Sequence, residues 1–223
     1  MKGLKRNKTM IIDERMDVFI NSVHKGISKE MADFEKEAID NCVPIIRKPT
    51  QILLRYILTS SKPKRVLEVG TAVGFSSIYM SDFLDKDARI DTIERMEERI
   101  IEARKNIKKY GKEEMINLLE GDATLVLKEL DKSYDMIFLD AAKGQYINFF
   151  EDIMRLLAPG GILVSDNVLQ DGEIIESKYA INKRDRTIHG RMRDYLYTIN
   201  HDERLESVVL PNGDGVALSY RVK

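Results

Sequence analysis

The segment Glu68-Val69-Gly70-Thr71-Ala72-Val73-Gly74-Phe75-Ser76 decides the fold of this chain. It ends a short apolar run and leads into a stretch whose apolar residues have helical spacing. Two glycines between a strand and a helix let the backbone turn sharply and approach a ligand, and the helix that follows presents free N–H groups. Their spacing is not G-x-G-x-x-G, which disfavours a nicotinamide dehydrogenase. The segment therefore predicts a strand, a ligand-binding turn and a helix.

Short apolar runs alternate with amphipathic stretches from residue 65 onward. The apolar runs are Val66–Val69, Ile90–Ile93, Ile116–Leu119, Met136–Leu139 and Ile162–Val164. The stretches between them are Ser76–Leu84, Glu97–Tyr110, Thr124–Leu130 and Tyr146–Leu157. Continuous apolar strands separated by helices indicate a parallel sheet that is covered on both faces.

The C-terminal part changes this pattern. A helical stretch, Thr187–Ile199, precedes the strand-like runs Leu205–Leu210 and Val216–Val222, which Pro211-Asn212-Gly213-Asp214-Gly215 joins. Two strands joined by a Gly-rich turn form a hairpin, so one of them runs antiparallel to the rest of the sheet. The prediction is an α/β, Rossmann-like fold with a seven-stranded, mostly parallel sheet and a C-terminal antiparallel hairpin.

The N-terminal third predicts helices. Apolar residues recur at helical spacing in Ile12–His24, Ser28–Asn41 and Gln51–Leu58, with Ser28 as a candidate cap. Two prolines, Pro44 and Pro49, are expected to break the pattern. We interpret residues 1–223 as one domain, with a helical cap over residues 1–60 and a core over residues 65–223.

Composition excludes several classes of protein. The chain has 223 residues with 36 Lys and Arg against 37 Asp and Glu, and its net charge of −1 argues against a nucleic-acid partner when the whole chain is considered. No apolar run approaches the ~18 residues of a membrane-spanning helix, so no membrane partner is expected. The single cysteine, Cys42, excludes an internal disulfide, is expected to be a small buried hydrophobe, and suits a reducing cytoplasm.

The pattern E-V-G-T-x-x-G-[FY]-S resembles the first motif of class I S-adenosylmethionine-dependent methyltransferases. More narrowly, it is similar to the cation-dependent O-methyltransferases related to catechol and caffeoyl-CoA O-methyltransferases, over about residues 40–223. The resemblance implies S-adenosylmethionine (SAM) as cofactor. The residues it implies as cofactor ligands are Ile46, Glu68, Gly70, Thr71, Gly74, Ser76, Glu94, Asp122, Ala123 and Asp140.

Four of these positions have specific expected roles. Gly70 would lie against the methionine part of the cofactor, and Ser76 would bind its carboxylate. Glu94 would accept hydrogen bonds from both ribose hydroxyls, and Asp122 from the adenine amino group. The alternative interpretation is that Glu94 and Asp122 only cap the helices that follow them.

A second motif, L-D-A-A-K … G-G-I-L-V-S-D-N, resembles the metal site of the same family. Asp140, Asp166 and Asn167 follow two neighbouring strands, and oxygen ligands of this kind suit Mg²⁺ or another divalent cation. By resemblance, Lys143 is catalytic together with Asp140, and takes the proton of the acceptor hydroxyl or holds its oxyanion. The alternative is a surface lysine. The expected acceptor carries a hydroxyl beside a second oxygen, which completes a chelate.

The resemblance leaves the acceptor open between tRNA, a small catechol or phenol, and a caffeoyl-CoA-like ester. One bacterial branch methylates 5-hydroxyuridine at the tRNA wobble position to 5-methoxyuridine, a base that must be presented unstacked. Basic segments favour this choice: residues 1–9 hold four cations and no acid, and residues 178–193 hold six cations and one acid. The predicted contacts with the anticodon loop are Lys183, Arg184, Arg186, Arg191 and Arg193.

Helical spacing places Arg186, His189 and Arg193 on one face of the predicted helix. It places another set on a separate, apolar face: Ile188, Met192, Tyr195 and Ile199. Tyr146 and Phe149 are expected in the core.

A non-catalytic RNA-binding protein with a retained SAM pocket is the alternative function from another class of protein. The resemblance also implies a homodimer.

Overall fold

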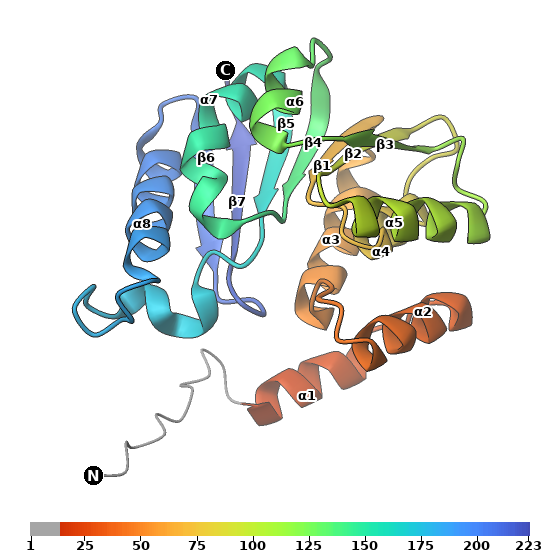
Figure 1. The fold of residues 1–223 in the computed structure, drawn as a ribbon, viewed down its shortest axis with the longest axis horizontal. Helices are drawn as coiled ribbons and strands as arrows, with labels where there is room; N and C mark the ends of the chain where they lie inside the picture. The colour runs from red at the N-terminus through yellow and green to blue at the C-terminus, as the bar shows by residue number, and fades with distance from the viewer. Residues whose placement is uncertain (1–13) are drawn as a thin grey trace.

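The computed structural model describes residues 14–223, and a seven-stranded sheet lies at its centre, in the order β3-β2-β1-β4-β5-β7-β6 (Figure 1). Strands β1 to β5 are parallel, and β7 runs antiparallel to both β5 and β6. The predicted Rossmann-like sheet is thus confirmed. The strands are β1 (Arg65–Val69), β2 (Arg89–Glu94), β3 (Ile116–Glu120), β4 (Tyr134–Leu139), β5 (Leu157–Ser165), β6 (Leu205–Leu210) and β7 (Val216–Arg221).

Helices cover both faces of the sheet and bury two apolar clusters. Successive side chains of a strand point to opposite faces, so Val66 packs with one cluster and Leu67 with the other. The first cluster includes side chains of α2 (Lys29–Asp40), α3 (Lys48–Ser61), α4 (Phe75–Ser81) and α5 (Glu97–Lys109). The second includes side chains of α6 (Ala123–Glu129), α7 (Tyr146–Leu156) and α8 (Arg186–His201). Within residues 14–223, no helix combines the length and apolar character that crossing a membrane requires.

The N-terminal helices confirm one local prediction and correct two others. The Ser28 hydroxyl accepts a hydrogen bond from Met31 N at 3.2 Å and caps α2. Pro49 does not break a helix, because it lies in the first turn of α3, where the missing N–H costs no hydrogen bond. Cys42 is exposed, not buried, because it lies just after α2 with a φ of 56°, where the chain turns at the surface. The first helix, α1 (Glu14–Val23), leaves apolar side chains such as Phe19 exposed.

The buried face of α8 differs from the prediction. His189 is 3% exposed and belongs to the buried face with Met192, Tyr195 and Ile199, whereas Ile188 is 39% exposed. The segment before α8 adds a contact that the helical spacing does not predict. It contains a 3₁₀ helix that the sequence did not reveal, η2 (Gln170–Ile175), and η2 packs against α8. Ile188 instead lies over Gly144, which has no side chain to cover it.

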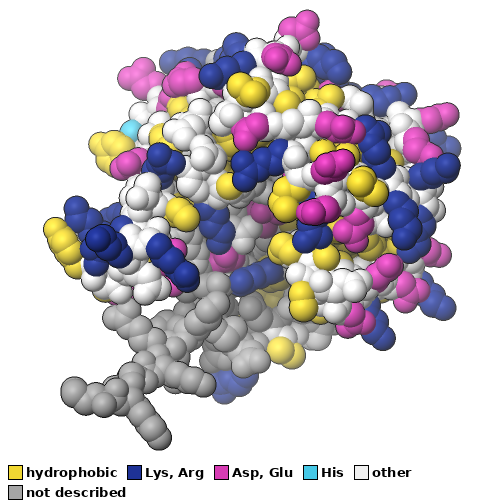
Figure 2. All heavy atoms as spheres, in the orientation of Figure 1, with side chains coloured by type: hydrophobic (Ala, Val, Ile, Leu, Met, Phe, Trp, Pro, Cys, Tyr) yellow, Lys and Arg dark blue, Asp and Glu magenta, His cyan; other side chains and the backbone are white. Residues whose placement is uncertain are grey.

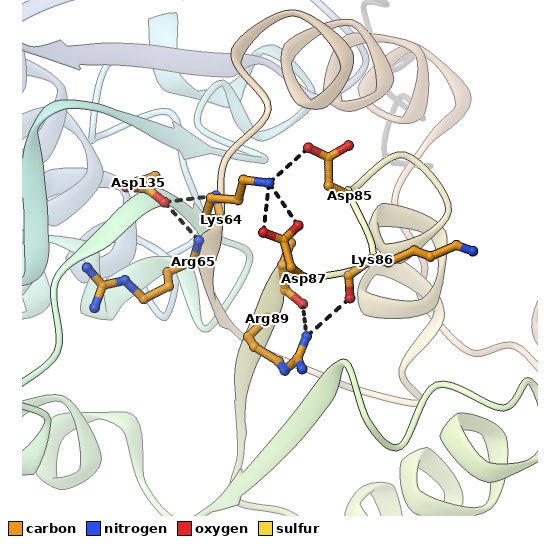
Figure 3. Close-up of polar contacts among 8 residues, drawn as sticks. Lys64, Arg65, Asp85, Lys86, Asp87, Arg89 and Asp135 are labelled. Atoms are coloured by element: carbon orange, nitrogen blue, oxygen red, sulfur yellow. Dashed lines mark hydrogen bonds and ion pairs between the residues drawn. The ribbon is translucent and has the colours of Figure 1, made fainter.

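Polar contacts fix the strands at the amino-terminal edge of the sheet (Figure 3). The Asp135 carboxylate of β4 accepts hydrogen bonds from the backbone N–H groups of Lys64 and Arg65, both at 2.8 Å. The Lys64 ammonium pairs with Asp85 at 3.0 Å and with Asp87 at 2.8 Å. These exposed ion pairs contribute little free energy individually. The carboxyl ends of the parallel strands lie at the other edge, where open α/β sheets bind ligands.

Candidate active site

A cavity of about 740 Å³ lies at the carboxyl ends of the parallel strands. Its wall comes from the segments that follow β1, β2, β3, β4 and β5, and from residues 44–46 before α3. Most of the predicted cofactor ligands lie in this wall: Ile46, Gly70, Thr71, Ser76, Glu94, Asp122, Ala123 and Asp140. The sequence also places Lys143 and Asn167 there correctly, and it misses Met96, Arg99, Gln145 and Phe149. Phe149 and Tyr146 are both buried, as predicted.

The two glycines of the first motif serve different purposes. Gly70 has a φ of +108°, and a Cβ at this position would overlap the backbone carbonyl of Asp140. Glycine is therefore required for the close approach of the segments that follow β1 and β4. Gly74 has a φ of +84° and is the N-cap of α4, so its requirement is conformational. Gly74 does not contribute to the cavity wall.

Glu68 lies beneath the cavity rather than in its wall. Its carboxylate is fully buried and accepts hydrogen bonds from the hydroxyls of Ser77 and Thr92, the latter at 2.6 Å. The Thr92 hydroxyl is in turn 2.6 Å from that of Thr71, which lies in the glycine segment. Burial raises the pKa of Glu68 to about 6. The structure thus gives Glu68 a supporting position, and a direct contact with the cofactor remains a prediction from the resemblance.

Replacing Glu68 with glutamine should change how stability depends on pH. The folded-state pKa of about 6 lies above the ordinary value of 4.5, so the folded protein holds this proton more tightly than the unfolded chain. Protonated Glu68 therefore stabilises the folded protein fully at pH values below the unfolded-state pKa of 4.5. This stabilisation, about 2 kcal/mol, is lost as the pH rises through 6. The free energy of unfolding of Glu68→Gln minus that of the wild type should therefore rise by about that amount between acidic and neutral pH. Urea unfolding of both proteins at acidic and at neutral pH measures this difference. A difference that does not change with pH would contradict the raised pKa of Glu68.

Glu94 and Asp122 line the cavity, and backbone N–H groups hold both carboxylates in place. Glu94 accepts hydrogen bonds from the backbone N–H groups of Ala72 and Met96, both at 2.9 Å. Asp122 caps α6 by accepting from Thr124 N at 2.9 Å and pairs with Arg95 at 3.2 Å. The hydrogen bonds from Thr124 are the main cause of the lowered pKa of Asp122. The cap interpretation is therefore confirmed for Asp122 and is compatible with its place in the cavity wall, whereas Glu94 does not cap α5, whose N-cap is Met96.

The three predicted metal ligands lie together at the ends of β4 and β5. Asn167 Nδ2 donates to Asp140 Oδ1 at 3.1 Å, and Asp166 Oδ1 accepts from Asn167 N at 2.8 Å and from the Thr50 hydroxyl at 3.3 Å. Asp140 and Asn167 line the cavity, whereas Asp166 is buried directly behind them. The Tyr146 hydroxyl lies 3.1 Å from the Asp166 carbonyl oxygen and links α7 to the segment that follows β5.

The chemistry of this donor set fits a divalent cation. Burial raises the pKa of both Asp140 and Asp166, and the charge of Glu68 adds to the effect at Asp140, as that of Asp140 does at Asp166. A cation would offset these like charges, and two carboxylates with an amide are the oxygen donors that Mg²⁺ accepts. Rotating the Asn167 amide by half a turn would present its oxygen to the ion. Within residues 14–223, no group of three or more His, Cys, Asp and Glu side chains is arranged to hold a metal ion. Asn167 as the third ligand stays a prediction from the resemblance.

Lys143 reaches the cavity wall from η1 (Lys143–Gln145). Its Nζ lies 3.1 Å from Asp214 Oδ2, in the turn between β6 and β7. Asp214 was not predicted as a site residue, because an Asp between two glycines is typical of an ordinary turn. The Arg191 guanidinium donates to the Gly144 carbonyl at 3.2 Å and ties α8 to the lysine segment.

The predicted RNA contacts lie outside the cavity wall. Lys and Arg side chains gather over the segment between η2 and α8, whereas basic and acidic side chains are interspersed elsewhere on this face (Figure 2). Lys183 and Arg184 are exposed. The other three arginines donate to backbone carbonyls: Arg186 to Ile181, Arg191 to Gly144 and Arg193 to Ile174. The basic tail over residues 1–9 lies outside the described residues.

Comparison with known proteins identifies the family. Residues 22–222 match the model of the O-methyltransferase family, and the chain belongs to it. The chain is 32% identical over 144 residues to a catechol O-methyltransferase of Niastella koreensis, a match that spans 63% of each protein. It is 30% identical over 179 residues to a caffeoyl-CoA O-methyltransferase of Stellaria longipes, covering 76% of this chain and 73% of the relative. The family predicted from the two motifs is confirmed.

Solved structures agree with this assignment. A Staphylococcus aureus protein described as a candidate caffeoyl-CoA O-methyltransferase superposes with a TM-score of 0.86 at 30% identity, over 94% of this chain and all of that one. The methyltransferase PaMTH1 of Podospora anserina, solved with S-adenosylhomocysteine (SAH) bound, gives a TM-score of 0.83 at 25% identity, over 93% of this chain and 94% of that one. The similarity extends over nearly the whole chain, so it includes the segments that form the cavity.

Proposed function

We propose that this chain transfers the methyl group of SAM to a hydroxyl that lies beside a second oxygen, with Mg²⁺ or another divalent cation bound at Asp140, Asp166 and Asn167. The observation that carries the proposal is the position of these three side chains. They adjoin the same cavity that the glycine segment, Glu94 and Asp122 line. One cavity thus combines a nucleoside-sized site with a hard-cation donor set.

The cofactor residues would act by orienting SAM. Gly70 allows the backbone to approach the ligand, and Ser76 lies in the first turn of α4, where N–H groups favour the cofactor's carboxylate. Glu94 is held by backbone N–H groups, so its remaining acceptor capacity is directed at the ribose hydroxyls. Asp122 and the Ala123 N–H would contact the adenine. SAM supplies a sulfonium methyl group, which is transferred by in-line displacement.

The acceptor residues would prepare and orient the nucleophile. A bound cation lowers the pKa of a coordinated hydroxyl by several units and fixes its direction. Lys143, at the cavity wall, would receive the hydroxyl proton or stabilise the oxyanion. Asp140 adjoins both the cofactor and the cation donor set, so it would set the distance between the two reactants.

Within this proposal, the acceptor is 5-hydroxyuridine in the anticodon loop of tRNA. Its 5-hydroxyl lies beside the 4-carbonyl, the arrangement that a cation chelates. Groups before and at the start of α8 support an RNA contact: Tyr179 is 76% exposed, and the cations of Lys178 and half-buried Arg186 lie 5.4 and 5.9 Å from its ring centroid. An exposed aromatic ring flanked by cations suits base stacking and phosphate contact.

Small catechols are the second candidate acceptors. The named activities of the relatives favour them, since these are catechol and caffeoyl-CoA O-methyltransferases. Arg186, Arg191 and Arg193 also donate to backbone carbonyls, which leaves fewer groups for phosphate contact.

We further propose that the chain forms a homodimer, in which the exposed apolar side chains of α1 contact a second copy.

A comparison of acceptors with a pair of charge variants tests the tRNA assignment. Methyl transfer from SAM is measured with hydroxyuridine-bearing tRNA and with catechol, and transfer to tRNA is the expected result. Lys183→Ala combined with Arg184→Ala should lower tRNA affinity and reduce the slope of log Kd against log salt by about 2, one for each phosphate contact. The control Lys86→Ala with Lys128→Ala removes the same charge elsewhere and should leave the slope unchanged. Turnover of catechol with no transfer to tRNA would assign the small acceptor instead.

A further inference from the structure

The turn of the C-terminal hairpin is fixed on the segment that carries the metal ligands. Val168 N donates to Gly215 O, and Leu169 N donates to Asp214 O, both at 3.0 Å. Val168 and Leu169 directly follow Asn167 in the chain. Gly215 has a φ of +86°, and a Cβ at this position would overlap the Leu169 side chain. The two segments therefore form one closely packed unit.

The Asp214 carboxylate connects this unit with Lys143. The Asp214 side chain is 4% exposed, whereas that of Lys143 is 36% exposed and lines the cavity, and their ion pair is 3.1 Å long. A lysine ammonium on a flexible four-carbon stem samples many positions unless a partner restricts it. A buried carboxylate on a fixed turn supplies such a partner.

We propose that Asp214 is a positioning residue for methyl transfer. It holds the Lys143 ammonium at the cavity wall and, through the turn, sets its place relative to the segment of Asp166 and Asn167. The inference rests on the proposed function of Lys143. Its importance follows from the sensitivity of catalysis to placement, since an error of 1 Å in a reacting group costs about 100-fold in rate.

Kinetics of Asp214→Asn test this role. This variant keeps the shape of the side chain and the backbone hydrogen bonds that join the turn to Val168 and Leu169. We expect kcat to fall by about 10- to 100-fold, while the Kd of SAM and the KM of the acceptor stay within about threefold. In a Lys143→Met background, the same substitution should change kcat by less than about threefold, because the group it positions is absent. Asp91→Asn is the matched control, since buried Asp91 pairs with Lys132 at 3.2 Å outside the cavity wall, and its kcat should equal that of the wild type.

Three kinetic results would overturn the inference: unchanged turnover in Asp214→Asn, an equal loss in the Lys143→Met background, or a fall in SAM affinity as large as the fall in kcat. A readout independent of turnover separates this inference from the proposed function. NMR of the Lys143 NζH₃ group, assigned by its loss in Lys143→Met, should show slow exchange that disappears in Asp214→Asn. If the wild type transfers no methyl group, the proposed function fails, and an NζH₃ signal unchanged in Asp214→Asn would still overturn the positioning role.

Discussion

Replacing Asp166 with asparagine is expected to lower the rate of methyl transfer by about a thousandfold. The carboxylate is buried behind the cavity wall and adjoins Asn167 and Asp140, so it is placed to supply charge to the cation rather than to touch the acceptor. Loss of one of two carboxylates weakens cation binding, and the acceptor hydroxyl then keeps its proton. The rate should be measured with saturating SAM at fixed Mg²⁺.

Two further readouts separate loss of the cation from loss of the fold. The wild type should gain thermal stability when Mg²⁺ is added, and Asp166→Asn should lose that gain while keeping the Kd of SAM within about threefold. Without Mg²⁺, the variant should be at least as stable as the wild type, because it removes one of two like charges whose burial raises their pKa values. Asp135→Asn at the opposite edge of the sheet is the control for changing a carboxylate. A variant that keeps wild-type turnover and the wild-type response to Mg²⁺ would remove Asp166 from the metal site.

Lys143→Met should lower kcat by about 10²- to 10⁴-fold, the range for a group that moves the transferred proton or stabilises the developing oxyanion. Methionine keeps most of the length of the side chain but cannot accept a proton or stabilise an oxyanion. The stabilisation by Mg²⁺ and the affinity for SAM should persist, because Lys143 lies outside the predicted metal donor set. This pattern differs from that of Asp166→Asn, in which the response to Mg²⁺ disappears.

Lys132→Met is the matched control for the lysine substitution. Lys132 also pairs with a buried aspartate, but outside the cavity wall, so its loss should affect stability without affecting kcat. Full turnover of Lys143→Met would show that Lys143 takes no part in methyl transfer despite its place in the cavity wall.

The sheet and its loops could be predicted because their signals are local. The run Val66–Val69 is buried on both faces of β1, with Glu68 as its one polar residue, and Gly70 is needed for contact with the Asp140 backbone. The strand ends fix Asp140, Asp166 and Asn167 at one edge of the sheet, so their proximity followed from the order of elements alone. The spacing of the glycine and metal motifs therefore carried enough information to place the cavity.

Contacts that depend on packing between distant segments could not be predicted. His189 is buried on the face of α8 that packs on other elements, and its polar ring gave no signal of that place. Glu68 belongs to the first motif but lies outside the cavity wall, where its carboxylate bonds with Ser77 and Thr92 from neighbouring elements. Asp214 lies 71 residues from Lys143 in the chain, in a turn whose sequence indicates only a hairpin.

The dependence of methyl transfer on a divalent cation tests the central claim most directly. Transfer of labelled methyl from SAM to hydroxyuridine-bearing tRNA and to catechol is followed with Mg²⁺, with a chelator, and with Mg²⁺ restored in excess of the chelator. We predict incorporation into at least one acceptor with Mg²⁺, loss of about a thousandfold in the chelator, and recovery when Mg²⁺ is restored. Transfer that continues at full rate in the chelator would contradict the account.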